Sequence, residues 1–477
     1  MSPRFGIFLL ALGVVLAATA SQASAAAPAD FAGHWEGVIE LPGMDPGLTV
    51  QVDLQLEGAV WTGTIDIPMQ GAKGLALTGI AATADSVRFA IAGIPGDPTF
   101  AGRLEGGAIR GTFTQGGSAF PFRLGREAMA GAARPQEPKP PFPYRAEEVT
   151  VPNGGITLAG TLTLPEGDGP FPAVVLVSGS GPQDRDEMVF QHRPFLILAD
   201  HLARAGIAAL RYDDRGFGKS TGDFRSATTE DFAQDALAAV RFLRGRPEVA
   251  AERIGILGHS EGGLVAPMAA GRSKEVAFVI LLAGPGVSGG EILEAQTEKI
   301  ALAGGASPED AAKQAELIRR AVALVRSEPD SQKVHDAAME IAREQVALMS
   351  EEERQALGEN IDAMLEQQVA ALTTPWFRFF LDYDPRPALT RLQVPVLALN
   401  GGLDTQVPPV QNLPEIHKAL AAAGNRDATV VELPGLNHLF QKATTGAPDE
   451  YFGIEETMNP AALDAISGWI RERFVEK

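Results

Sequence analysis

The chain has 477 residues, of which 45% are hydrophobic, so it can form two or three domains with sizeable cores, which excludes a disordered protein. Its formal charge of −20 disfavours nucleic acid and anionic membrane surfaces as partners. The sequence contains no cysteine, which excludes disulfides, a thiol nucleophile and lipid attachment through cysteine.

The N-terminal residues have the pattern of a secretory signal peptide. Arg4 precedes an apolar run over residues 5–20, and Ala23 and Ala25 then form the small-x-small pattern of a cleavage site. The apolar run is short for a bilayer span of about 20 residues, so an uncleaved anchor is the weaker interpretation. We therefore predict a signal peptide over residues 1–25, cleavage after Ala25, and a periplasmic or secreted protein without a membrane span.

Residues 31–125 are expected to form a small antiparallel β domain. Segments 35–40, 50–56 and 61–67 alternate apolar and polar residues, and glycine and proline separate them. Residues 33–35, Gly-His-Trp, resemble the start of lipocalin-like barrels. The domain contains no catalytic constellation, so we expect a folding or solubility role rather than ligand binding. Residues 126–145 follow as a linker, because repeated prolines favour extended backbone.

From residue 146 to residue 477, apolar strand candidates alternate with helical segments. This order predicts an α/β domain with a mostly parallel sheet and helices on both faces. The strand candidates are 173–177, 207–211, 254–257, 277–282, 396–399 and 429–433, and a hairpin over 149–164 precedes them. The stretch of about 289–385 is rich in Ala, Glu, Gln and Arg at helical spacing, so we expect a helical cap inserted between two core strands.

The pentapeptide Gly-x-Ser-x-Gly, which places a serine on a strained strand-to-helix turn, occurs around Ser220, Ser260 and Ser288. Only Ser260 directly follows a short buried strand candidate and precedes a helix of small residues. Ser288 is expected to cap the first helix of the cap. Ser220 lies in a Gly-Lys-Ser sequence, but Asp213 stands where a phosphate-binding loop needs glycine. We therefore predict that Ser260 is the nucleophile.

A serine hydroxyl becomes a strong nucleophile only when an adjacent base takes its proton. In sites built on such a turn, the acid and then the histidine follow the serine along the chain. Three histidines follow Ser260. His335 lies in the predicted cap and His417 in an amphipathic helix, whereas His438 lies in a loop directly after the last strand candidate. His438 is therefore the predicted base.

The base needs a carboxylate on its other ring nitrogen, which fixes the tautomer and stabilises the imidazolium. Asp404 lies in the loop at the carboxyl end of strand candidate 396–399, one strand before the histidine loop. Asp427 competes by chain order, but it precedes a strand and is expected at the wrong edge of the sheet. Asp404 is therefore the predicted orienting acid.

Two backbone N–H groups must also face the negative oxygen that develops during acyl transfer. One is expected from Glu261, directly after the nucleophile, and the other from the loop over residues 178–186. Ser180 is the first choice for this second donor and Gly181 follows closely. The Glu261 side chain is expected to have a structural or pocket role.

Residues 146–477 resemble the α/β-hydrolase superfamily. The motifs at 178–186, 213–220, 258–262, 401–407 and 437–438 together are similar to its bacterial serine-aminopeptidase-like and esterase branch. The resemblance implies a mostly parallel eight-stranded sheet and hydrolysis of esters, thioesters or amides through an acyl-enzyme, without a metal or organic cofactor. The common His-Gly of the oxyanion loop is Ser178-Gly179 here, which leaves the choice between Ser180 and Gly181 open.

Three functions compete: a carboxylesterase, an aminopeptidase acting on short peptides, and a catalytically silent binding protein. A complete triad in the right order argues against a silent protein. Glu294, Glu298 or Asp382 of the cap could hold a peptide's α-ammonium, but charged cap helices are normally solvated, which favours an esterase. Trp376 and Phe377 are expected to pack between cap and core or to line the substrate pocket. The expected partner is a small-molecule ester or short peptide, and the sequence predicts no oligomeric state.

Overall fold

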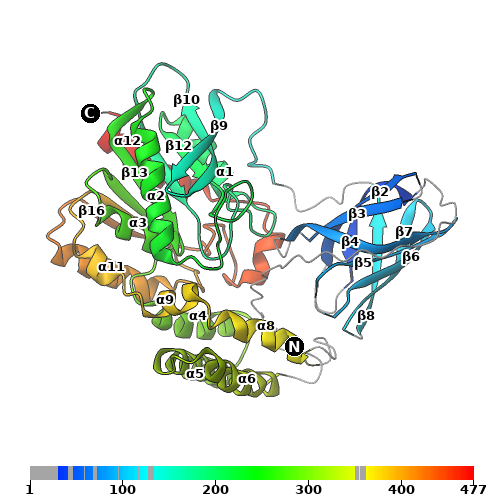
Figure 1. Cartoon of the computed structure of the whole chain (residues 1–477). Helices are drawn as coiled ribbons and strands as arrows, with labels where there is room; N and C mark the ends of the chain where they lie inside the picture. The colour runs from blue at the N-terminus through cyan, green and yellow to red at the C-terminus, as the bar shows by residue number, and fades with distance from the viewer. Residues whose placement is uncertain are drawn as a thin grey trace.

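The structure is a computed structural model that describes residues 31–40, 47–58, 60–67, 72–94, 96–116, 118–126, 134–349, 354 and 361–476. The expected signal peptide and its cleavage site after Ala25 lie outside these residues. No helix in the described ranges is long and apolar enough to cross a membrane. Figure 1 shows a β barrel beside a larger body of sheet and helices.

The N-terminal strands close into an eight-stranded barrel in which each strand pairs with the next and β8 pairs with β1. The strands are β1 (Gly33–Ile39), β2 (Leu48–Glu57), β3 (Val60–Ile67), β4 (Ala72–Ala82), β5 (Ser86–Ile91), β6 (Thr99–Glu105), β7 (Ala108–Gln115) and β8 (Ser118–Gly125). Trp35, Phe89 and Phe100 are fully buried inside, and the last two rings stack at 4.8 Å. The expected all-β domain is thus confirmed as a barrel with a packed interior.

The second sheet has eight strands in the order β16-β15-β14-β13-β11-β12-β10-β9. Its strands are β9 (Tyr144–Asn153), β10 (Ile156–Pro165), β11 (Phe171–Val177), β12 (Ala208–Tyr212), β13 (Val249–His259), β14 (Phe278–Leu282), β15 (Val396–Gly401) and β16 (Ala428–Leu433). All pairs from β12 to β16 are parallel, whereas β9 and β10 form an antiparallel hairpin at one edge. The predicted mostly parallel sheet is confirmed, and the carboxyl ends of its parallel strands lie at one edge of the sheet.

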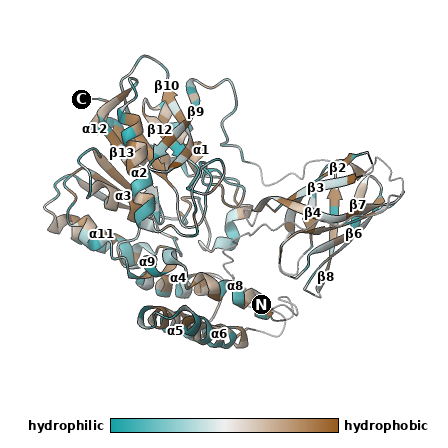
Figure 2. Ribbon diagram, in the orientation of Figure 1, coloured by the Kyte–Doolittle hydropathy of each residue, from teal (hydrophilic) through white to brown (hydrophobic). Residues whose placement is uncertain are grey.

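Helices cover both faces of this sheet because its strands are apolar on both sides. The helices are α1 (Pro194–Arg204), α2 (Thr229–Arg244), α3 (Gly262–Ala270), α10 (Arg386–Leu389), α11 (Pro409–Ala422) and α12 (Pro460–Phe474), with a 3₁₀ helix over Pro448–Gly453. One core cluster joins α2, α3 and α11 to the sheet, and another joins α1 and α12 to it. Figure 2 shows that hydrophobic residues are concentrated in the strands of this sheet.

A group of helices enters between β14 and β15, where the sequence predicts a cap. These helices are α4 (Gly289–Ala303), α5 (Pro308–Ser327), α6 (Ser331–Ala347), α8 (Ile361–Ala371) and α9 (Pro375–Asp382). They have their own small apolar clusters, one built around Val325, Val334 and Leu381. In Figure 1, α4 and α9 lie nearest the sheet, and α5 and α6 form an outer layer. The expected α/β-hydrolase fold with a helical cap is therefore confirmed.

Candidate active site

Ser260 lies on a tight turn between the end of β13 and the start of α3. Its φ of +52° is in the left-handed region, which is strained for a residue other than glycine. A Cβ at position 258 would collide with the Gly262 carbonyl, and one at position 262 with the Val177 carbonyl. Glycine is therefore required on both sides of the turn. Ser260 itself is partly exposed, whereas the residues directly before and after it are buried.

The other two serines in the same pentapeptide pattern have structural bonds. The Ser220 hydroxyl donates to the Asp213 carbonyl at 2.6 Å and accepts from the Ala159 N–H at 2.9 Å. Ser288 forms a capping box with Glu291 at the start of α4. The prediction that Ser288 caps the first cap helix is confirmed.

His438 and Asp404 form a buried hydrogen-bonded pair. His438 Nδ1 lies 2.8 Å from Asp404 Oδ2, and the two side chains are 5% and 0% exposed. The other carboxylate oxygen of Asp404 accepts the N–H groups of Gln406 and Val407, each at 2.8 Å. These bonds hold the carboxylate toward His438, so the Nε2 of His438 remains available to accept a proton from a neighbouring group.

The histidine loop contacts the serine turn through the residue before the nucleophile. His259 Nε2 lies 3.0 Å from the His438 carbonyl oxygen, and the two rings are 4.8 Å apart. Within the described residues, Ser260 Oγ makes no hydrogen bond to His438. Such catalytic bonds are often long without substrate and tighten in the substrate complex.

The competing acid and histidines lie elsewhere. Asp427 pairs with Arg473 at 2.6 Å, and its carbonyl bonds to Val396 at the start of β15, the edge opposite the site. His335 pairs with Glu366 inside the cap. His417 lies on α11, as expected.

The loop over residues 178–186 packs directly against the nucleophile turn. A Cβ on Gly179 would lie 3.1 Å from Ser260 Cβ. The Gly179 N–H is already bonded to Glu187 Oε1 at 2.7 Å, which removes it from the candidate oxyanion donors. Among the described residues, the N–H groups of Ser180, Gly181 and Glu261 have no acceptor. The geometry leaves the choice between Ser180 and Gly181 open, and Ser180 is the more exposed of the two.

The side chain of Glu261 is buried beside Ser260 and bonded to the cap. Its Oε1 accepts from the Thr229 hydroxyl at 2.6 Å and from the Trp376 indole N–H at 2.8 Å. Its Oε2 has no partner within the described residues. Burial raises the pKa of Glu261, and the hydrogen bonds from Thr229 and Trp376 oppose that rise.

The two aromatic residues expected near the pocket face different neighbours. Trp376 stacks on Phe380 with ring centroids 5.4 Å apart, and its N–H reaches the core at Glu261. Phe377 instead packs against the cap cluster that contains Val325 and Leu381. The indole of Trp376 therefore joins cap to core, whereas the position of Phe377 is explained by packing within the cap.

Residues that the sequence reasoning missed bind the linker to two segments of the hydrolase domain, one before α1 and one that follows the histidine loop. Arg134 donates to main-chain carbonyls of residues 190–191 and 452–454 at distances of 2.6–3.4 Å. Gln136 bonds to the backbone of Thr457 and Met458. No local sequence signal could have found these contacts, because the partners lie between 56 and 322 residues apart.

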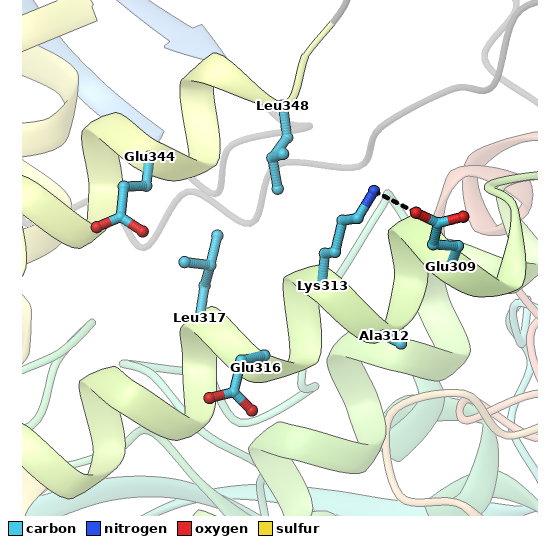
Figure 3. A pocket seen from close by; sticks show the side chains of 7 residues that line it. All are labelled: Glu309, Ala312, Lys313, Glu316, Leu317, Glu344 and Leu348. Carbon is cyan, nitrogen blue, oxygen red and sulfur yellow. Dashed lines mark ion pairs between the residues drawn. The ribbon is translucent and has the colours of Figure 1, made fainter.

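Figure 3 shows a pocket of the cap that lies between α5 and α6. Leu317 and Leu348 form part of its wall, and Lys313 pairs with Glu309 at its rim. None of the predicted site residues lines this pocket. Within the described part of the chain, no group of three or more His, Cys, Asp or Glu residues could hold a metal ion.

Comparisons with known proteins match the part of the chain that carries these residues. The sequence pattern of the family described as "X-Pro dipeptidyl-peptidase (S15 family)" matches residues 154–439. Esterase EstD of Thermotoga maritima is 29% identical over 336 residues, which are 69% of this chain and 68% of that protein. Thiohydrolase aneE of Aspergillus aculeatus is 35% identical over 127 residues, 26% of this chain and 37% of that protein. A solved esterase of Pyrococcus furiosus is 15% identical, with a TM-score of 0.43 over 73% of this chain and 99% of that one.

Proposed function

The chain belongs to the family described as X-Pro dipeptidyl-peptidase (S15 family), and within it we propose a serine hydrolase that cleaves carboxylic esters through an acyl-enzyme on Ser260. One observation carries the proposal. The buried His438–Asp404 pair lies at the carboxyl edge of the sheet, beside the strained turn that exposes Ser260. The similarity to an esterase over two thirds of the chain supports the same activity class.

The proposed chemistry follows from the proton positions. Asp404 holds the proton of His438 on Nδ1, so Nε2 can take the proton of Ser260. The Ser260 oxygen then attacks the acyl carbon, and the N–H groups of Glu261 and Ser180 stabilise the oxyanion. The leaving alcohol takes the proton from His438, and water, activated by the same histidine, releases the acid.

Peptide cleavage is the second candidate function, because the family description names a peptidase. An aminopeptidase needs an acidic group for the substrate's α-ammonium. Two of the cap carboxylates expected for this role already pair with arginines, Glu294 with Arg319 at 3.0 Å and Asp382 with Arg326 at 2.9 Å. Paired carboxylates attract an ammonium less strongly, so the ester remains the preferred substrate class.

Fluorophosphonate labelling tests the nucleophile. The Ser260→Ala protein should lose the label, whereas Ser220→Ala and Ser288→Ala, which carry the same motif, should keep it. A label that persists in folded Ser260→Ala would end the assignment and with it the proposed acyl-enzyme.

Turnover of p-nitrophenyl acyl esters, measured beside aminoacyl and X-Pro anilides, tests the substrate class. We expect kcat/KM to be higher for the esters. Preferred cleavage of the anilides would replace the esterase by a peptidase, and no turnover of either with an unlabelled Ser260 would favour a silent binding protein.

We also propose export to the periplasm or the medium after removal of residues 1–25. The support is the sequence pattern around Ala23 and Ala25. Mass spectrometry of the protein recovered from periplasmic and culture fractions should give an N-terminus at Ala26. An intact N-terminus on a membrane-bound protein would contradict it.

A further inference from the structure

His259, the residue before the nucleophile, has acceptors on both ring nitrogens. Its Nδ1 lies 2.8 Å from Glu187 Oε1, and its Nε2 lies 3.0 Å from the His438 carbonyl oxygen. The same Glu187 oxygen accepts the Gly179 N–H at 2.7 Å. His259 and Glu187 are 6% and 3% exposed, so water does not replace these bonds. The paired side chains of His259 and Glu187 therefore connect the serine turn, the oxyanion loop and the histidine loop.

The number of protons on the ring decides whether both bonds exist. A neutral imidazole has a single N–H, and its other nitrogen is an acceptor. A carbonyl oxygen donates nothing, and an ionised carboxylate also only accepts. Glu187 Oε1 already receives the Gly179 N–H, as a carboxylate oxygen readily does. The two contacts of His259 are therefore both hydrogen bonds when the ring carries two protons and Glu187 is ionised.

The surrounding charges agree with this protonation. Burial by itself would lower the pKa of His259, but the charge of Glu187, the bonds to Glu187 and to the His438 carbonyl, and the charge of Asp404 raise it overall. His192 gives the contrast within the same chain. Its nitrogens contact Thr457 and Tyr451 but no carboxylate, and burial lowers its pKa to about 4.

We propose that His259 is a positioning residue, held as a doubly protonated imidazolium, whose two N–H groups join the oxyanion loop to the loop of the catalytic histidine. The inference rests on the proposed hydrolase function for its effect on rate, but the protonation itself can be measured without turnover. A neutral His259 loses one of its two bonds, so either Glu187, which holds the Gly179 N–H, or the His438 carbonyl is no longer fixed relative to Ser260. We expect kcat to fall and KM to change little, because acyl transfer needs this alignment and ground-state binding does not.

The sign of the pH effect follows from the direction of the pKa shift. The imidazolium of His259 is present below its raised pKa and is lost as pH rises through it. The alkaline limb of the kcat profile therefore reports the loss of the second proton of His259.

The first test is Glu187→Gln, which keeps an oxygen acceptor for Gly179 and His259 but removes the negative charge. We expect the alkaline limb of kcat to move to lower pH by about one unit or more, as for loss of an opposite charge at contact distance. The acid limb should stay in place. Glu230→Gln removes the same charge from an exposed pair with Arg272 on the surface and should leave both limbs unchanged.

The second test is the ¹⁵N spectrum of wild-type protein labelled at histidine, with the resonances assigned by their loss in His259→Asn and His192→Asn. At pH 7.5 we expect protons on both nitrogens of His259 and on one nitrogen of His192. A single protonated nitrogen on His259, or an unshifted alkaline limb in folded Glu187→Gln, would overturn the proposal. If Glu187→Gln does not fold, the wild-type spectrum decides alone. A failure of the esterase assignment would not change the ¹⁵N resonances of His259 or His192. The proposed function and the proposed protonation of His259 can therefore fail separately.

Discussion

The hydrogen bond between Trp376 and Glu261 joins the cap to the residue after Ser260, and Trp376→Phe removes this bond while keeping an aromatic ring. The bond is 2.8 Å long and its acceptor is 2% exposed. A hydrogen bond to a charged group contributes about 1.5–3 kcal/mol to stability. The phenyl ring can still stack on Phe380, so the ring contact changes little. We therefore expect the free energy of unfolding to fall by about 1.5–3 kcal/mol.

A double-mutant cycle with Glu261→Gln isolates this bond. If the indole acts through the carboxylate, Trp376→Phe should cost much less in the Glu261→Gln background, with a coupling free energy of about 1 kcal/mol or more. Trp469→Phe is the matched control, since its indole N–H bonds to the Thr429 hydroxyl on the other side of the core at 3.3 Å. Its effect should add to that of Glu261→Gln. Urea denaturation with tryptophan fluorescence and circular dichroism gives the four free energies.

The pH dependence of the cycle provides a second check. Burial raises the pKa of Glu261, so its contribution to stability is present below the unfolded pKa and is lost as pH rises through the folded pKa. Glu261→Gln should therefore gain stability relative to wild type as pH rises. The cost of Trp376→Phe should grow in the same direction, because the indole donates to a carboxylate that is charged at high pH. Strict additivity, with coupling below about 0.5 kcal/mol at every pH, would refute this reasoning.

Three further predictions concern the triad, the cap and the linker. Asp404→Asn should lower kcat by about 10⁴-fold while circular dichroism shows that the fold is kept, whereas Asp427→Asn should leave kcat unchanged. The reverse result would make Asp427, and not Asp404, the orienting acid. Trp376→Ala should shift kcat/KM among p-nitrophenyl esters of different chain length by about 10-fold or more, and an unchanged profile would remove this ring from the pocket. Arg134→Ala should lower the free energy of unfolding by about 1.5–3 kcal/mol and reduce kcat, while Arg193→Ala, which removes an arginine whose ion pair with Glu137 is 3.8 Å long, should do neither. Equal effects of the two variants in denaturation and turnover would contradict a specific role of the Arg134 bonds.

The order of strands and helices could be predicted because it is written in local patterns. Apolar runs that alternate with helical segments predicted each strand of the parallel sheet. The alternation before residue 125 predicted an antiparallel β domain, in which only three of the eight strands were placed. The hairpin is longer than expected, since β9 begins at Tyr144 inside the range expected for the linker. Tyr144 pairs with Pro165 across the hairpin, a contact that the proline-rich composition before it does not reveal.

The candidate triad could also be named from the sequence, because each member lies at a point with a local signature. Glycine must flank Ser260, where a Cβ would collide with backbone carbonyls, and that requirement appears as a motif. Asp404 and His438 each follow a strand, and parallel strands bring their carboxyl ends to one edge. The pairing of these two side chains at 2.8 Å agrees with that expectation, while their catalytic roles stay predictions.

The sequence by itself determined the classes of fold and of candidate nucleophile, whereas only the tertiary structure decided what surrounds them. His259 meets Glu187 across 72 positions, Trp376 meets Glu261 across 115, and Arg134 reaches Ile454 across 320. No periodicity or motif links residues at such separations, because their distance depends on how the sheet orders its strands and on where the cap and linker fold back. The electrostatics of the site depend on these contacts, since burial lowers the pKa of His192, whereas at His259 the charge and hydrogen bond of Glu187, with the other polar neighbours, outweigh burial and raise the pKa.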